Sequence, residues 1–183
     1  MHSPDISQMY FLALVCPLNV DEKILQFKYW MRDHFNCTVA LKSPAHITLV
    51  PPFWHPEKDE PELIGFLRGF SSSILPITIN ISGFSHFEKR VLYAAISENP
   101  PLKGLQAAVT AYFEQFIKVQ NQNEGRSFHP HITIANRDMK KGDFDKAWQY
   151  FSTKKFTDLF TSDKLSLLKL GEGKWEVIAE NKW

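Results

Sequence analysis

Cysteine is scarce in this sequence, which has two cysteines, Cys16 and Cys37, among 183 residues. Both lie in apolar surroundings, and they do not form a C-x-x-C pair. Small secreted domains that depend on disulfides have many more cysteines than this. We therefore expect two buried free thiols in a reducing compartment.

Long apolar runs are also absent. The longest apolar runs are no longer than "MYFLALVC", residues 9–16, whereas a membrane-spanning helix needs about 20 apolar residues. The residues before it contain Asp5 and no lysine or arginine, which does not match the basic start of a signal peptide. The sequence predicts a cytoplasmic protein with no membrane partner.

Positive and negative charges nearly balance in this chain, whose formal net charge is +1. Its lysines and arginines are scattered, and a long nucleic-acid footprint needs many clustered cations. A small nucleotide or a short RNA end is still compatible with this balance. With 44% apolar and 22% charged residues, the composition is that of one compact globular unit, which we expect to be a monomer.

What the sequence does contain is a regular alternation of strand and helix patterns. The expected strands are residues 9–16, the stretch with His46, 77–81, 90–97, the stretch with His131, 165–170 and 175–180. The expected helices are residues 19–35, 60–75, 99–117 and 144–151. Asn19, with Glu22 three residues later, is the expected N-cap of the first helix, and Asn99 is that of the third.

Two segments of similar length, residues 9–51 and 91–136, each read strand, helix, strand, and each has the tripeptide His-Ile-Thr in its second strand. An internal duplication would explain this similarity. Together with the terminal hairpin it predicts an α+β fold of one domain. We expect two pseudo-symmetric lobes, each an antiparallel sheet with helices outside, around a central cleft.

The repeated tripeptide places His46 with Thr48, and His131 with Thr133, at alternate positions of a strand. Side chains two residues apart on a strand share one face. The apolar neighbours lie on the other face and would anchor each strand in its own lobe: Ile47, Leu49, Ile132 and Ile134. The polar faces are then free to converge on a shared cleft.

Two imidazoles and two hydroxyls suit the cleavage of a phosphodiester without a metal. A histidine has an ordinary pKa near 6.5, so one member of a pair can act as general base and the other as general acid near neutral pH. Threonine hydroxyls can donate hydrogen bonds to the phosphate oxygens on which charge develops. The pattern does not say which of His46 and His131 is the base.

In these features the sequence resembles the 2H phosphoesterases, a superfamily that includes RNA 2′,3′-cyclic phosphodiesterases and bacterial 2′-5′ RNA ligase-like proteins. Their defining mark is a pair of His-x-Thr motifs in two pseudo-symmetric lobes, and the segments "MYFLALVCP" and "FEKRVLY" extend the likeness. The resemblance implies metal-independent action on cyclic phosphates or 2′-5′ linkages, with a 2′-phosphate product and no cofactor. It also implies a substrate-binding role for Phe87, as a ring that stacks on a base. Arg137 stands one place further along than the basic residue of some members, and we expect it to be a phosphate ligand.

Two alternatives stay open at this point. His129 shares the strand face of His131, so the pair could bind a metal ion in a metallohydrolase, although no carboxylate stands at a persuasive spacing. The fold could also serve as a non-catalytic module that binds nucleotides or RNA ends.

Overall fold

The computed structural model describes residues 6–74, 76–117 and 127–182. Its strands are β1 (Ser7–Val15), β2 (His46–Pro56), β3 (Ile77–Phe87), β4 (Val91–Ile96), β5 (His131–Ala135), β6 (Thr157–Ser162), β7 (Lys164–Leu170) and β8 (Trp175–Lys182). Its helices are α1 (Leu18–Phe35), α2 (Glu60–Gly69), α3 (Pro100–Phe113) and α4 (Lys141–Ser152), with short 3₁₀ turns at Val39–Lys42 and Glu57–Asp59.

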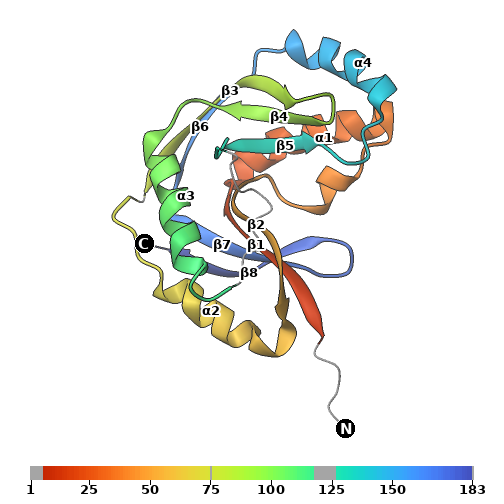
Figure 1. Ribbon diagram of the computed structural model, residues 1–183. Coiled ribbons are helices and arrows are strands. Elements are labelled where there is room, and N and C mark those ends of the chain that lie inside the picture. The colour runs from red at the N-terminus through yellow and green to blue at the C-terminus, as the bar shows by residue number, and fades with distance from the viewer. Residues whose placement is uncertain (1–5, 75, 118–126, 183) are drawn as a thin grey trace.

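The strands form two four-stranded sheets, in the orders β2–β1–β7–β8 and β5–β4–β3–β6. Every neighbouring pair of strands is antiparallel. Helices α2 and α4 lie on the outside of the molecule, against β8 and β3 respectively (Figure 1). The predicted two-lobed α+β fold with antiparallel sheets is therefore confirmed. Within the described residues, no helix combines the length and apolar character needed to span a membrane.

The two strand–helix–strand segments exchange their helices. Helix α1 follows β1 in the chain but contacts β5 of the other sheet, and α3 follows β4 but contacts β2. One continuous apolar core results, which contains residues of both sheets and of all four helices. The internal duplication stays a prediction, and residues 118–126 of its second segment lie outside the described part of the chain.

Several local predictions can be compared directly with the structure. Asn99 does cap α3, because its side chain accepts a hydrogen bond from the Leu102 amide at 3.0 Å. The terminal hairpin β7–β8 forms, and Cys16 and Cys37 are buried free thiols. Strand β6 (Thr157–Ser162) was not predicted.

The predicted N-cap of the first helix was wrong. The helix begins one residue before Asn19, and the cap position is Pro17. The Pro17 carbonyl accepts hydrogen bonds from the amides of Val20 and Asp21. Proline has a preset φ and no amide hydrogen to satisfy, so it starts the helix without a side-chain cap.

The second helix is shorter than its apolar pattern predicts and ends at Gly69. Phe70 is extended, and the side-chain amide of Asn181 donates to the carbonyls of Leu67 and Phe70 at 3.0 and 2.7 Å. These bonds come from β8, more than 100 residues later in the chain. They satisfy carbonyls at the helix end, which lack partners within the helix.

Candidate active site

The two His-Ile-Thr tripeptides start strands β2 and β5, which are edge strands of their sheets and contact each other. Both strands begin with the same burial pattern, in which partly buried histidine and threonine alternate with fully buried residues. The fully buried neighbours each expose at most 1% of their surface: Ile47, Leu49, Ile132 and Ile134. This alternation puts the four polar side chains on one side of their strands, which we call the motif face.

The pairing register is the same around both motifs. The residues opposite the motif side chains are Val15 for His46, Ala13 for Thr48, Ala95 for His131 and Tyr93 for Thr133. In each pair of strands an irregularity in the register comes just beyond the threonine pair, at Leu12/Ala13 and at Leu92/Tyr93. Residues directly opposite each other share a face of the sheet, so Ala13, Val15, Tyr93 and Ala95 also belong to the motif face.

Both motif histidines are held by the carbonyl two residues earlier in the chain. Nδ1 of His46 lies 2.7 Å from the Pro44 oxygen, and Nδ1 of His131 lies 2.8 Å from the His129 oxygen. A carbonyl oxygen can only accept a hydrogen bond, so Nδ1 is the protonated nitrogen in both rings. Nε2 is therefore the atom of each ring that can take up or release a proton in a reaction.

The segment that carries the Pro44 carbonyl is fixed from α1. Lys28 is almost completely buried, and its Nζ donates to the Ser43 carbonyl at 2.9 Å. The carboxylate of Asp21 accepts a hydrogen bond from the Ala45 amide at 2.6 Å. Burial lowers the pKa of Lys28 to about 8, against the opposing effect of Asp21. These two side chains hold the residues on either side of Pro44, and sequence analysis missed both because they lie on a helix remote from the motif.

The other lobe uses a different support for its carbonyl. The Tyr93 hydroxyl and Nε2 of His129 form a hydrogen bond of 3.2 Å. His129 lies two residues before His131, the first residue of β5, and supports its ring through the backbone carbonyl. Within the described residues, no group of three or more His, Cys, Asp or Glu side chains could hold a metal ion.

The two motif histidines have lowered pKa values. The pKa of His46 is lowered to about 4, mainly by burial; the bond to the Pro44 carbonyl opposes the shift, and the charges of Lys28 and of a protonated His131 add to it. Burial also lowers the pKa of His131, helped by His129 and opposed by the bond to the His129 carbonyl. Burial removes the water that solvates a charged imidazole and so favours the neutral ring.

Aromatic side chains flank both histidines. The Phe11 ring lies 4.8 Å from the His46 ring, and the Trp175 ring lies 4.6 Å from Phe11. They belong to a small apolar cluster separate from the main core, which consists of Phe11, Ala13, Leu168, Val15 and Trp175. Sequence analysis gave neither Phe11 nor Trp175 a role in the site, although the alternation of β1 puts Phe11 on the face of Ala13.

The structure also shows where the two predicted substrate-binding residues lie. The Phe87 ring is 4.9 Å from His131 and nearly perpendicular to it, and it lies 4.4 Å from Tyr93. Phe87 therefore does lie beside a motif histidine. Arg137 is exposed in the turn that follows β5, and its role as a phosphate ligand stays a prediction.

Comparison with known proteins identifies the family. Residues 19–174 match the family model described as the 2′-5′ RNA ligase superfamily. The chain belongs to this superfamily. The match confirms the resemblance to the 2H phosphoesterases inferred from the sequence, and it indicates the phosphoesterase or ligase chemistry of that superfamily.

Individual relatives are more distant. A protein of Bacillus pumilus (strain SAFR-032), whose name places it among the phosphoesterases, is 26% identical over 140 residues, which cover 73% of this chain and 76% of that protein. The crystal structure of TT0787 of Thermus thermophilus has a TM-score of 0.65 at 16% identity and covers 95% of this chain and 97% of that one. Escherichia coli LigT complexed with 3′-AMP has a TM-score of 0.64 at 18% identity and covers 97% and 98%. At these identities the structures show a shared fold.

Proposed function

We propose that this superfamily member is a metal-independent phosphoesterase that hydrolyses 2′,3′-cyclic phosphates of nucleotides or RNA ends, or 2′-5′ phosphodiesters, to a 2′-phosphate. One observation carries the proposal. His46 and His131 lie on strands that contact each other, and a backbone carbonyl holds Nδ1 of each ring, so both leave Nε2 for proton transfer. Paired imidazoles in this state suit concerted general base and general acid catalysis.

In the proposed reaction with a 2′,3′-cyclic phosphate, Nε2 of one histidine takes a proton from water. The water oxygen forms a bond to phosphorus, and the bond from phosphorus to O3′ breaks. Nε2 of the other histidine gives its proton to O3′, which leaves a 2′-phosphate and a protonated base. Thr48 and Thr133, on the same face, donate hydrogen bonds to the non-bridging oxygens.

We assign the base to His46 and the acid to His131. His46 has its pKa lowered to about 4 by burial, so it is neutral over most of the pH range and can accept a proton. His131 also has a lowered pKa, but the negative charge of a bound phosphate favours the protonated form of a nearby imidazole. A nucleotide partner is supported by the crystals of E. coli LigT with 3′-AMP, ATP and NADP+.

The first test is turnover in the presence of EDTA. We expect the wild-type protein to convert a 2′,3′-cyclic mononucleotide and a short RNA with a cyclic-phosphate end to products with a 2′-phosphate. Chelation should leave the rate unchanged, because the proton transfers use imidazoles rather than a metal-bound water. Phosphorus NMR identifies the product, and a 3′-phosphate would contradict the proposed assignment of the leaving oxygen.

The two alternatives give different results in this test. A metallohydrolase that used His129 and His131 would lose its activity to EDTA and recover it when metal is added. A non-catalytic module would bind the nucleotide product measurably but turn over neither substrate.

The lowered pKa values predict an acidic pH optimum. The base has to be neutral, so activity is lost as the pH falls through the pKa of His46, about 4. The acid has to be protonated, so activity is lost as the pH rises through the pKa of His131, which is below its usual value. The pH dependence of kcat/KM reports the pKa values of the free enzyme. It should therefore be bell-shaped, with its maximum below about pH 6.5.

The same profile measured for His34→Ala serves as its control, because His34 is an exposed histidine on α1. That variant should have an unchanged curve. An acid limb near 6.5 in the wild type would contradict the assignment of His46 as a buried neutral base.

A further inference from the structure

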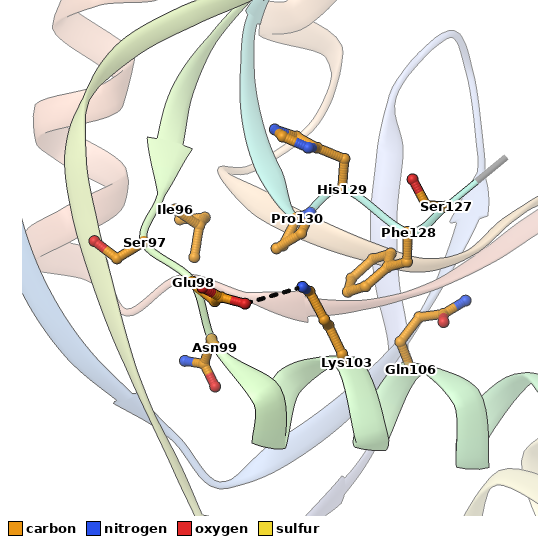
Figure 2. Close-up of a pocket in the computed structure, with 10 residues that line it drawn as sticks. All are labelled: Ile96, Ser97, Glu98, Asn99, Lys103, Gln106, Ser127, Phe128, His129 and Pro130. Atoms are coloured by element: carbon orange, nitrogen blue, oxygen red, sulfur yellow. Dashed lines mark ion pairs between the residues drawn. The ribbon is translucent and has the colours of Figure 1, made fainter.

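A cavity of about 480 Å³ lies beside the segment that leads into His131 at the start of β5. Its walls are the end of β4, the first half of α3 and residues 127–130, which precede β5 (Figure 2). His129 lines the cavity, and its carbonyl is the one that holds His131. The cavity thus borders the support of the proposed general acid, and its volume is within the range of about 300–1,000 Å³ that is typical of small-molecule sites.

Two opposite charges face this cavity from its α3 side. Nζ of Lys103 lies 3.6 Å from the Glu98 carboxylate, and the two side chains are 51% and 80% exposed. An exposed ion pair of this length contributes little to stability. A ligand can therefore replace this ion pair with its own contacts to Lys103 and Glu98 at a small cost in free energy.

The third feature of the cavity is an aromatic ring. Phe128 extends from the 127–130 segment toward Lys103 (Figure 2), and it packs against the main core as a partly buried side chain. The core holds the ring in place, and the part of the ring that is not buried lines the cavity. Aromatic side chains held in this way are the usual platforms on which single-stranded bases stack.

These groups together select the chemistry of the ligand. The Glu98 carboxylate would repel a simple anion. A purely apolar ligand would remove water from the ion pair without offering it hydrogen bonds in return. A ribonucleotide matches every group, because it has a phosphate for Lys103, ribose hydroxyls for Glu98 and a base for Phe128.

We propose that this cavity binds the nucleotide next to the one that carries the cyclic phosphate, so that the substrate of this enzyme is an RNA end rather than a free mononucleotide. The inference rests on the proposed function. Phe128 stacks on the base of the bound nucleotide, Lys103 donates to its phosphodiester, and Glu98 accepts from its ribose. Phe128 is three residues from His131, so their Cα atoms are at most about 11 Å apart, which is within reach of an adjacent nucleotide.

The experiment compares a 2′,3′-cyclic mononucleotide with a dinucleotide that ends in the same cyclic phosphate. We expect the wild type to prefer the dinucleotide in kcat/KM. In Lys103→Met and Phe128→Leu the ratio of the two kcat/KM values should fall about tenfold, from the loss of a phosphate contact or of base stacking. Lys182→Met is the matched control, because Lys182 is also an exposed, ion-paired lysine but lies at the end of β8; its ratio should equal that of the wild type.

The inference would be overturned if both cavity variants kept the wild-type ratio of the two kcat/KM values, including the case in which both values fall equally. The proposed hydrolysis would stand in either case. Binding of the 2′-phosphorylated dinucleotide, measured by calorimetry, tests the cavity without turnover. Lys103→Met should weaken this binding about tenfold relative to that of the mononucleotide product. Equal binding by wild type and variant would overturn the inference, whereas absent turnover with intact binding would overturn only the proposed hydrolysis.

Discussion

His46→Ala and His131→Ala should each lower kcat on a 2′,3′-cyclic phosphate by about 10²–10⁴-fold, the usual contribution of one general acid or base. The proposed reason is that each variant loses the Nε2 atom that moves a proton, while the neighbouring strand pairs persist. The double variant should be only slightly slower than the single ones, because groups that act in one step have non-additive effects. Steady-state rates in EDTA measure all three.

A second substitution separates catalysis from support of the backbone. Asparagine at position 46 can donate its side-chain amide to the Pro44 carbonyl, as Nδ1 of His46 does at 2.7 Å, but it cannot exchange a proton near neutral pH. His46→Asn should therefore fold like the wild type and be as inactive as His46→Ala. Recovery of activity in His46→Asn would show that the histidine acts through the carbonyl bond alone. Thermal unfolding, with His34→Ala as an unaffected reference, checks that each variant is folded.

Thr48→Val and Thr133→Val should each lower kcat by about 10²–10³-fold, the range observed when one donor to a developing oxyanion is removed. Valine has nearly the same shape as threonine and a high strand propensity, so the pairing of Thr48 with Ala13 and of Thr133 with Tyr93 should persist. The change removes only the hydroxyl. KM should change less than kcat, because the hydroxyl acts mainly on charge that develops in the transition state.

Serine provides the rescue, since it restores a hydroxyl at the same position. Thr48→Ser and Thr133→Ser should recover most of the activity that valine loses. Thr161→Val is the matched control, because Thr161 is an exposed strand threonine of β6 and its hydroxyl faces no proposed substrate group. Full activity of both motif valine variants would contradict the proposed role of the hydroxyls.

The general features of the motif face follow from local sequence. The strand period of two is enough to put His46 beside Thr48 and His131 beside Thr133, and to put their apolar neighbours in the core. The cap by Asn99 and the terminal hairpin are local in the same way, since their partners are close in the chain. These features could be predicted because short-range sterics and burial decide them.

Contacts between distant segments could not be predicted in this way. The second helix ends where Asn181 of β8 binds its carbonyls. The segment that carries the Pro44 carbonyl is held by Lys28, which donates to the neighbouring Ser43 carbonyl and whose burial depends on the packing of α1. Trp175 reaches Phe11 only because β7 pairs with both β1 and β8. No pattern within a single segment contains this information.

By itself the sequence determined that this protein has two His-x-Thr strands in an α+β fold of the 2H type, because the motif and the alternation around it are local properties. The tertiary structure decided that the edge strands β2 and β5 contact each other, which carbonyls hold the two imidazoles, and that a cavity with Phe128 and Lys103 borders the segment that leads into β5. These depend on packing between residues far apart in the chain, where the burial of whole surfaces, rather than local preference, decides the arrangement.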